Sequence, residues 1–389
     1  MPRTEPRLWL ALALLWLSGL AQAAPRIGVV TMEPGEIFFE RFGHNAIVVA
    51  DAEAGTAIAY NFGYFDMAEP GFFGNFVQGR MQYQLVALPL DRDLARYEQL
   101  GRGVGLQWLD LTPAQATRLA AVLAEHARPE NARYTYDYYT SNCSTKVRDA
   151  LDEVLGGALA QQLTGRSQGN TYRMESVRLA TPAPWMALGF HLGLGGYADR
   201  PLSRWDESFI PMRLRDALRD VTLADGRPLV VSEETLLPHR VGQPPDEAPR
   251  LRVPAFFGGL GLAALVLWAG RRWPRSLAAG ALAFWTVAGA AGTVMALIWF
   301  ASAHIAGYAN QNLLLFSPLC LALLPGGWAR LRGRSPGRRF TWLLRAVVAG
   351  AAVAGFLKFL PFLAQQNTEW VLLLLPLHWA LLRAFDPTP

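Results

Sequence analysis

Cysteine is scarce in this chain, because Cys143 and Cys320 are the only two among 389 residues. Cys320 lies deep in an apolar segment, so we do not expect the two to form a disulfide. Two cysteines also exclude a disulfide framework and a cysteine-rich metal cluster, and no other motif predicts a metal ion or a cofactor. We therefore expect neither. A free thiol in an exported protein is a liability without a use, which makes Cys143 a candidate for chemistry.

Lysine is almost absent too, with Lys146 and Lys358 as the only two. The net charge of +5 is therefore largely carried by arginine. Two arginine clusters lie between apolar segments: Arg271, Arg272 and Arg275, then Arg330, Arg332, Arg334, Arg338 and Arg339. Arginines in such places indicate membrane orientation and not DNA binding, so we expect no nucleic-acid partner.

The first apolar run is too short to span a bilayer. It covers Leu8–Leu20, whereas a spanning helix needs about 20 residues. Arg3 and Arg7 precede it and Ala21-Gln22-Ala23 follows, the pattern of a cleaved signal peptide. We expect a signal peptide over residues 1–23; an uncleaved anchor is the alternative.

Residues 24–237 predict an exported α+β domain. Alternating apolar residues indicate strands over 26–32, 42–50, 57–62, 82–90 and 105–111. Thr112-Pro113 begins a helical pattern that continues to His126, and a second helix is expected over 145–155. The glycine-rich run 189–196 lacks the spacing of a dinucleotide-binding loop, so we interpret it as a cover segment.

The hydrophobic residues, 52% of the chain, gather towards the C-terminus. Residues 238–252 predict a linker, and residues 253–389 a membrane region of about five helices over 253–270, 277–301, 313–328, 346–363 and 370–382. With the preceding domain outside, both arginine clusters fall in the cytoplasm, as the positive-inside rule requires. We expect a multi-pass protein of the inner membrane with its first domain on the periplasmic or extracellular side.

The outer loops of this topology contain polar residues, among them His304, and Lys358 lies near the second loop. Ionisable groups near hydrocarbon are costly and often functional, so His304 is a candidate for substrate contact. The alternative is that these loops are polar because loops generally are.

Cys143 and His44 form a candidate nucleophile and general base. Cys143 lies at the start of the helix expected over 145–155, where unpaired N–H groups and the helix dipole favour a thiolate. His44 begins a predicted strand and follows Gly43. The competing interpretation is a buried cysteine and a strand histidine that belong to the core.

An imidazole base needs a polar partner that fixes its orientation. A neighbouring strand should supply it, so Asn61 is the first choice, before Tyr60 and Asp66. Three tyrosines precede Cys143 in the sequence: Tyr136, Tyr138 and Tyr139. They would either donate to the oxyanion or pack the sheet against the helix. The candidates for substrate or oxyanion contact are Asn142, Ser144, Tyr138, Tyr139, Asp66 and His304.

The order of a histidine strand and then a cysteine helix resembles the permuted papain-like group, which includes lecithin:retinol acyltransferase and NlpC relatives. Four motifs occur in order: Phe42-Gly-His-Asn45, Tyr60-Asn-Phe-Gly63 with Phe65-Asp66, Tyr134-Thr-Tyr-Asp137 and Asn142-Cys-Ser-Thr145. Together they resemble the exported domain of Lnb-type lipoprotein N-acyltransferases over residues 26–215.

The resemblance implies an acyl transfer through a thioester on Cys143, with His44 as the base. The acyl chain would come from the diacylglyceryl group of a bacterial lipoprotein, and the lipoprotein's α-amine would accept it to give a lyso-form product. Membrane lipids and lipoproteins are thus the expected partners. The alternatives are a Cys-His hydrolase of cell-wall peptides or lipid esters, and a non-catalytic membrane sensor or scaffold.

Overall fold

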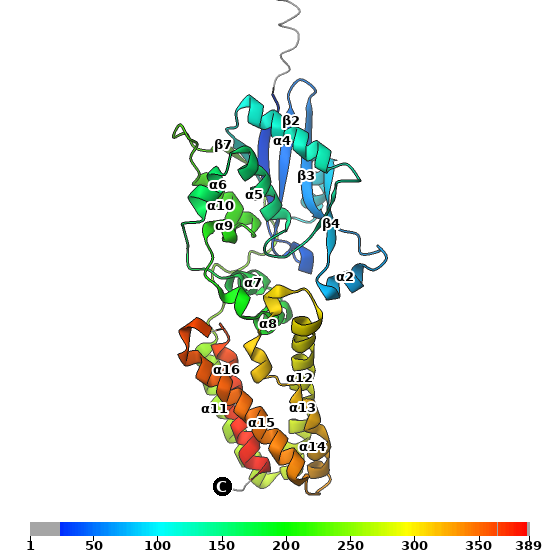
Figure 1. The fold of residues 1–389 in the computed structure, drawn as a ribbon, viewed down its shortest axis with the longest axis vertical. Helices are drawn as coiled ribbons and strands as arrows, with labels where there is room; N and C mark the ends of the chain where they lie inside the picture. The colour runs from blue at the N-terminus through cyan, green and yellow to red at the C-terminus, as the bar shows by residue number, and fades with distance from the viewer. Residues whose placement is uncertain (1–23, 364, 387–389) are drawn as a thin grey trace, which may run out of the picture. The chain divides into compact units, whose positions relative to one another are not determined.

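The computed structural model describes residues 24–363 and 365–386, so the expected signal peptide lies outside the described residues (Figure 1). The chain divides by its internal contacts into two units. The sheet unit contains residues up to Asp66, Gln82–Arg166 and Ser203–Gly242. The membrane unit contains Met67–Met81, Ser167–Leu202 and the chain from Gln243 onward. These boundaries differ from the expected ones, because two segments of the expected exported domain group with the membrane helices.

A seven-stranded antiparallel sheet forms the centre of the sheet unit, in the order β6-β4-β3-β2-β1-β5-β7. The five strands expected from alternation are present, and two short or irregular ones are additional. The bounds are β1 Arg26–Met32, β2 His44–Asp51, β3 Thr56–Tyr64, β4 Gln82–Pro89, β5 Val104–Leu109, β6 Arg133–Thr135 and β7 Val230–Leu237.

Both faces of the sheet are covered. Val29 and Ile47 face a core that includes Leu119 of α4 (Pro113–His126) and Val147 of α5 (Cys143–Val154). Figure 1 shows α4 and α5 crossing this face. The alternate positions, such as Ala46, face α3 (Leu90–Gln99) on the other side. The remaining helices of the unit are η1 Phe38–Glu40, α6 Ala158–Leu163, α9 Arg204–Glu207 and α10 Pro211–Arg219.

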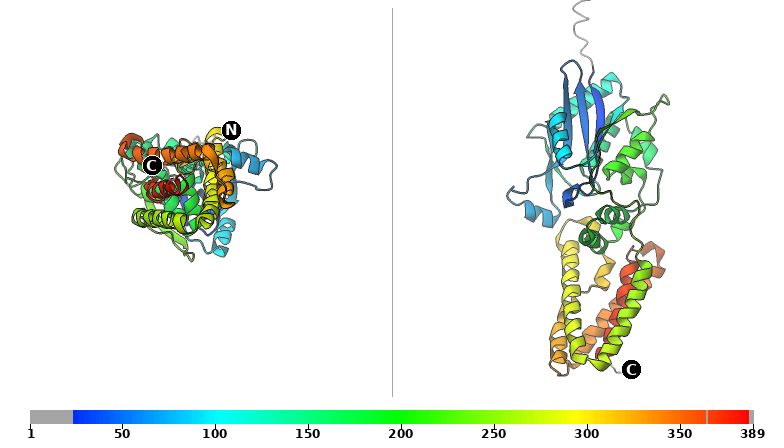
Figure 2. Two further views of the ribbon diagram at one scale, coloured as in Figure 1. Left: turned by 90° about the horizontal axis from the view of Figure 1, so that it is seen from below. Right: turned by 180° about the vertical axis from the view of Figure 1, so that it is seen from behind.

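Four helices of the membrane unit are long and apolar enough to cross a bilayer, and a bent pair raises the number to five among the described residues. The four are α11 Arg252–Arg272, α12 Pro274–Ala301, α15 Gly337–Phe356 with η5 Leu357–Phe359, and α16 Thr368–Phe385. In Figure 2 the red α16 lies between the yellow-green α11 and the orange α15.

The third expected span is broken. It consists of η4 Gln311–Leu314, α13 Leu319–Ala322 and α14 Leu324–Leu331, and its two parts are bent by 60°. Pro318 and Pro325 lie in this stretch, and proline lacks the N–H that continues a helix. The segment is therefore a broken span or a re-entrant loop instead of the continuous helix expected over 313–328.

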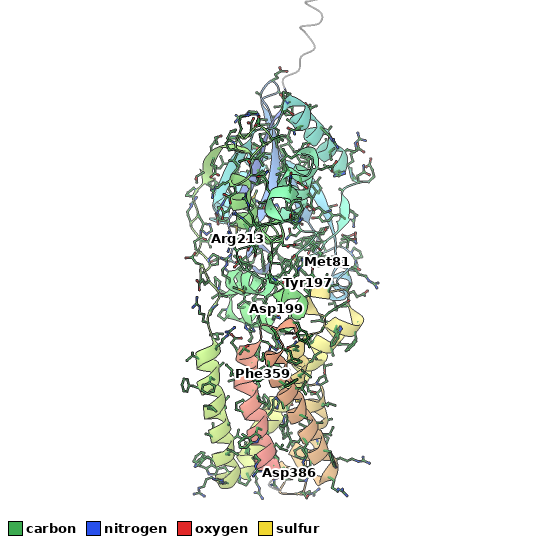
Figure 3. The ribbon with its side chains drawn as sticks, turned by 60° about the vertical axis from the view of Figure 1, so that its left-hand side comes forward. Met81, Tyr197, Asp199, Arg213, Phe359 and Asp386 are labelled. Carbon is green, nitrogen blue, oxygen red and sulfur yellow. The ribbon has the colours of Figure 1, made fainter. Side chains whose placement is uncertain are left out.

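The membrane unit also contains short elements that precede the spans in sequence. They are α2 Phe72–Gln78, α7 Tyr172–Ala180, α8 Pro184–Gly193 and η2 Gly196–Asp199, with η3 Ile305–Gly307 and η6 Pro361–Leu363 in the later loops. A buried ion pair joins Arg173 of α7 to Asp199 of η2 at 2.7 Å, and Asp199 also accepts from the backbone N–H of Gln366 (Figure 3). The segment 189–196, which we expected to form a cover, is the C-terminal half of α8 and the first residue of η2.

Two glycines of α12 test the packing of the membrane unit. A Cβ on Gly292 would lie 1.8 Å from the carbonyl oxygen of Phe316, whereas a Cβ on Gly280 would meet nothing within 4 Å. We expect Gly292→Ala to destabilise the unit by about 1–3 kcal/mol, the usual cost of overpacking. Thermal unfolding of the full chain in detergent measures it, with Gly280→Ala as the matched control. Equal melting temperatures for the two variants would contradict the close approach of α12 to Phe316.

Candidate active site

The N-terminus of α5 is held by the side chain of Asn142. Its Oδ1 accepts from the backbone N–H groups of Ser144 (3.0 Å) and Thr145 (2.9 Å). Its Nδ2 donates to the carbonyl oxygens of Tyr138 (2.9 Å) and Phe209 (2.8 Å). This cap makes Cys143 the first residue of the helix, two residues earlier than the sequence pattern predicts.

The thiol of Cys143 is partly buried at this helix start. Burial raises its pKa, while the backbone N–H groups of Asn45, Ser144 and Cys143 itself, and the charge of Arg102, lower it. Burial has the larger effect. The helix start thus lowers the pKa of the thiol, as expected, but burial outweighs this effect and the neutral thiol is favoured in the resting site. The same N–H groups remain directed at any negative charge that develops there.

His44 is held by a chain of two further side chains. Its Nε2 lies 2.9 Å from Oδ1 of Asn61, and Nδ2 of Asn61 donates to Oδ2 of Asp93 at 2.9 Å. Because the Asp93 carboxylate accepts from the amide nitrogen, the amide oxygen must accept from His44. Nε2 is thus the protonated nitrogen, and Nδ1 has the free lone pair.

The pKa of His44 is lowered to about 4. Burial is the main cause; the hydrogen bond that His44 donates to Asn61 raises the value, and the charges of Arg102 and Arg96 lower it. His44 is therefore neutral at physiological pH and able to accept a proton, the state that a general base needs.

His44 and Cys143 lie at the same end of the sheet. His44 is the first residue of β2, and Gly43 before it has φ 77°, with a would-be Cβ only 2.8 Å from the carbonyl oxygen of Met32, so glycine is required there. The N–H that reaches the Cys143 sulfur belongs to Asn45, the residue after His44. By strand alternation the His44 side chain belongs to the face that α3 covers, and Cys143 packs with the core on the opposite face. The backbone at the start of β2 therefore lies beside Cys143, with the N–H of Asn45 directed at the sulfur.

Tyr134 and Gly63 complete the surroundings of the thiol. Gly63 has φ 96°, and its would-be Cβ lies 3.6 Å from Cβ of Cys143 and 3.8 Å from the Tyr134 hydroxyl. That hydroxyl is buried and has no hydrogen-bond partner among the described residues. Burial raises the pKa of Tyr134, and a charge on Cys143 raises it further. Tyr134 is thus a neutral O–H donor beside the sulfur.

Arg102 provides a fixed positive charge near the pair. It is buried, its Nε donates to the carbonyl oxygen of Glu33 at 2.8 Å, and its Nη1 lies 3.6 Å from a carboxylate oxygen of Glu40. Its Nη2 has no hydrogen-bond partner in the described part of the chain. Its charge lowers the pKa of both Cys143 and His44, so it favours negative charge on the sulfur and a neutral imidazole.

Several other residues that were candidates for substrate or oxyanion contact make contacts elsewhere in the structure. The Asn142 side chain is used by the cap, and the Ser144 hydroxyl donates to the carbonyl oxygen of Ser208 at 2.6 Å. The Tyr139 ring packs against Phe209 in the core. His304 belongs to the membrane unit, where its Nε2 lies 2.8 Å from the carbonyl oxygen of Phe76.

Three further candidates occupy different places. The Asp66 side chain is exposed after the end of β3. Tyr60 is buried with the core on the α5 face, away from the Asn61 side of its strand. The Tyr138 ring contacts Tyr136, whose ring lies 4.2 Å from that of Tyr83. Of the residues proposed to orient His44, Asn61 is the one observed in contact with it.

Sequence reasoning missed three residues of the site. Asp93 and Arg102 come from α3 and the turn after it, and no motif distinguishes them from other charged surface residues. Tyr134 was part of a motif quoted for the family resemblance, so a signal for it existed. Only the fold shows that its hydroxyl lies beside Cys143.

Two family models match the chain in order. The Lnb N-terminal periplasmic domain matches residues 16–181, and the Lnb transmembrane domain matches residues 254–384. The chain belongs to the Lnb family. This Lnb-type protein therefore has a periplasmic domain followed by a transmembrane region and is a multi-pass membrane protein, and its family is associated with acyltransferase activity. No curated protein and no solved structure matches the chain.

The pKa of His44 predicts the acid limb of the activity. Because the free enzyme needs a neutral imidazole, we expect kcat/KM to stay constant from neutral pH to about pH 5 and to fall as the pH approaches 4. Asn61→Asp adds a carboxylate that raises the pKa of His44 and moves the limb to higher pH. Asn61→Leu removes the hydrogen bond that raises the pKa of His44, so it should move the acid limb to lower pH. It should also reduce kcat/KM roughly 100-fold, because the imidazole ring is no longer held in its orientation.

The measurement is the pH profile of acyl transfer by the full chain in detergent. A wild-type limb near the ordinary histidine pKa would contradict the burial of His44. Identical profiles for wild type and Asn61→Asp would contradict the contact between Asn61 and the imidazole.

Proposed function

We propose that this Lnb-type protein is a lipoprotein N-acyltransferase that carries a fatty acyl group as a thioester on Cys143. The observation that supports this most is a thiol at a helix start with three backbone N–H groups directed at it. One of these N–H groups belongs to Asn45, the residue after a histidine that Asn61 holds in a fixed orientation. A neutral histidine with a fixed tautomer and N–H groups around a nucleophile are the components of acyl transfer.

In the first step Nδ1 of His44 takes the proton of the Cys143 thiol, and the sulfur attacks the carbonyl carbon of a lipid ester. The resulting oxyanion is stabilised by backbone N–H groups at the start of α5 and by the Tyr134 hydroxyl. When the C–O bond of the ester breaks, the leaving alkoxide takes the proton from His44. The products are a lyso-lipid and an acyl thioester on Cys143.

In the second step the free α-amine of a lipoprotein attacks the thioester carbonyl. His44 removes a proton from the attacking nitrogen and returns it to the departing sulfur, so an amide forms and the thiol is regenerated. If the donor is the diacylglyceryl group of the lipoprotein itself, the product is an N-acylated lyso-form lipoprotein. The membrane unit would keep such a lipid substrate close to the enzyme.

The order of elements supports a permuted papain-like interpretation of the sheet unit. The strand with His44 comes before the helix with Cys143, and the partner of His44 comes from the neighbouring strand β3. By this interpretation Asn61 takes the role of the residue that orients the imidazole. Membrane lipids and lipoproteins are the proposed partners, with the sheet unit on the periplasmic side of the inner membrane.

The N-termini of lipoproteins test this function. Cells that lack other N-acylating enzymes would produce wild type, Cys143→Ser or His44→Gln, and mass spectrometry would identify the N-terminal lipopeptides. We expect lyso-form N-acylation with wild type and a loss of at least about 100-fold in both variants, since each removes a reacting group. His126→Gln, the same substitution at an exposed histidine at the end of α4, is the control.

Unchanged N-acylation in all strains would contradict the proposal. Release of free fatty acid by wild type without an N-acylated product would indicate that water, not an amine, resolves the thioester, and would assign a hydrolase.

A further inference from the structure

Three short elements of the membrane unit are fastened to one end of its helices. The first is α2, where the backbone N–H of Ala303 donates to the carbonyl oxygen of Gln78 at 2.8 Å and Nε2 of His304 contacts the carbonyl oxygen of Phe76. A Cβ on Gly79 would lie 2.9 Å from the backbone of Ala303, so the chain after α2 packs closely against this turn. The helix is thus attached just beyond the end of α12.

The second element is α8. Nδ2 of Asn310 donates to the carbonyl oxygens of Leu192 (2.8 Å) and Gly193 (3.0 Å), and Asn312 donates to Leu192 at 2.9 Å. The indole N–H of Trp370 also donates to Nδ1 of His191 at 3.0 Å. The C-terminal end of α8 is therefore fixed to the loop after α12 and to the start of α16.

The third element is the η5–η6 turn after α15. Nζ of Lys358 donates to the carbonyl oxygen of Gln365 at 2.6 Å, and Nε2 of Gln365 donates to Oδ1 of Asn310 at 3.0 Å. The same asparagine contacts α8, so the two elements share one buried polar network. Asn310, Gln365 and Lys358 thus make structural contacts in the outer loops, and so does His304, the candidate for substrate contact.

This end of the helices lies opposite the arginine clusters. α12 begins beside Arg271, Arg272 and Arg275 and ends at Ala301, where α2 is attached. Figure 3 shows Phe359 of η5 and Asp386 after α16 at opposite ends of the membrane unit. The positive-inside rule places the arginines in the cytoplasm and the three elements at the outer bilayer surface.

Each of the three elements exposes large apolar side chains. Phe73 and Val77 lie one turn apart on α2, and Phe73 is 67% exposed. On α8, Trp185 is 68% exposed. Leu188 is also exposed one turn later, whereas Met186 is buried. These exposed side chains differ from the groups that fasten the two helices, which are backbone carbonyls and the His191 ring.

The η5–η6 turn is similar, because Phe359 and Phe362 are each 80% exposed. The sequences of α2 and α8 contain no Asp, Glu, Lys or Arg. Exposed aromatic side chains without charges are unusual on a surface in water and common at the boundary of lipid headgroups and acyl chains.

The length of α12 places these elements at that boundary. Its 28 residues extend about 42 Å at ~1.5 Å per residue, more than the hydrocarbon core of about 30 Å. A helix whose other end lies beside cytoplasmic arginines therefore reaches into the outer headgroup region.

We propose that α2, α8 and the η5–η6 turn form an interfacial collar whose side chains Phe73, Val77, Trp185, Leu188, Phe359 and Phe362 insert into the outer leaflet. The occupant of this surface is the phospholipid interface itself. The collar holds the outer end of the membrane unit at a fixed depth. It follows from the membrane unit alone and does not depend on the chemistry of Cys143.

Depth-dependent quenching of a fluorescent label tests the collar. Phe73→Cys and Trp185→Cys would each be made in the full chain with Cys143→Ser, so that the remaining native cysteine is the fully buried Cys320. The labelled proteins would be reconstituted in phosphatidylethanolamine–phosphatidylglycerol vesicles that contain lipids with a nitroxide near the headgroup or near the chain end. We expect several-fold stronger quenching by the shallow nitroxide than by the deep one.

Two exposed valines provide the controls. Val231→Cys, on β7 of the sheet unit, should be quenched by neither lipid, and Val287→Cys, in the middle of α12, should be quenched more by the deep nitroxide. Quenching at Phe73 and Trp185 no stronger than at Val231 would overturn the proposal. So would cross-linking of these positions between two copies or to another protein, because either would be a different occupant. Val77→Cys and Leu188→Cys repeat the test if a first variant does not fold.

Discussion

The side chain of Asn142 is the contact on which the candidate site depends most. One amide holds two N–H groups at the start of α5 and two carbonyl oxygens of other segments, so it joins the helix to the Tyr138 turn and to Phe209 before α10. An unpaired buried group in this arrangement would cost about 1–3 kcal/mol. The position of Cys143, and the direction of the N–H groups around it, follow from this cap.

The electrostatics of the site favour a neutral pair at rest. Burial raises the pKa of the Cys143 thiol and lowers that of the His44 imidazole, and both shifts oppose separation of charge. In the proposed mechanism, proton transfer is therefore coupled to the attack on a carbonyl, where the N–H groups and the charge of Arg102 would stabilise the new oxyanion.

The sequence predicted the features that depend on local pattern. Short apolar runs located the strands around His44 and Asn61, because a strand buried on both faces needs apolar residues at successive positions. The first, second and fifth apolar segments are helices near the expected bounds, whereas the fourth, α15, begins nine residues earlier than expected, at Gly337. The contact of Asn61 with His44 could be expected because adjacent strands place such side chains side by side.

Features that depend on distant contacts could not be read from the sequence. Asp93 reaches Asn61 only because α3 packs on one face of the sheet, and the free Nη2 of Arg102 results from its buried position. In the sequence the segments 67–81 and 167–202 look like parts of the exported domain, because no local pattern indicates their contacts with the membrane helices, such as that of His191 with Trp370. Two prolines that interrupt an apolar segment did not show how far it bends.

The covalent intermediate tests the central claim most directly. Full-length enzyme, incubated with a phospholipid or lipoprotein donor in the absence of a free amine, would be digested and analysed by mass spectrometry before and after treatment with neutral hydroxylamine. The account predicts a fatty acyl group on the Cys143 peptide that hydroxylamine removes, and no such group in the Cys143→Ser enzyme. Acyl transfer by wild type without any acylated Cys143 peptide, or transfer that persists in the Cys143→Ser enzyme, would contradict it.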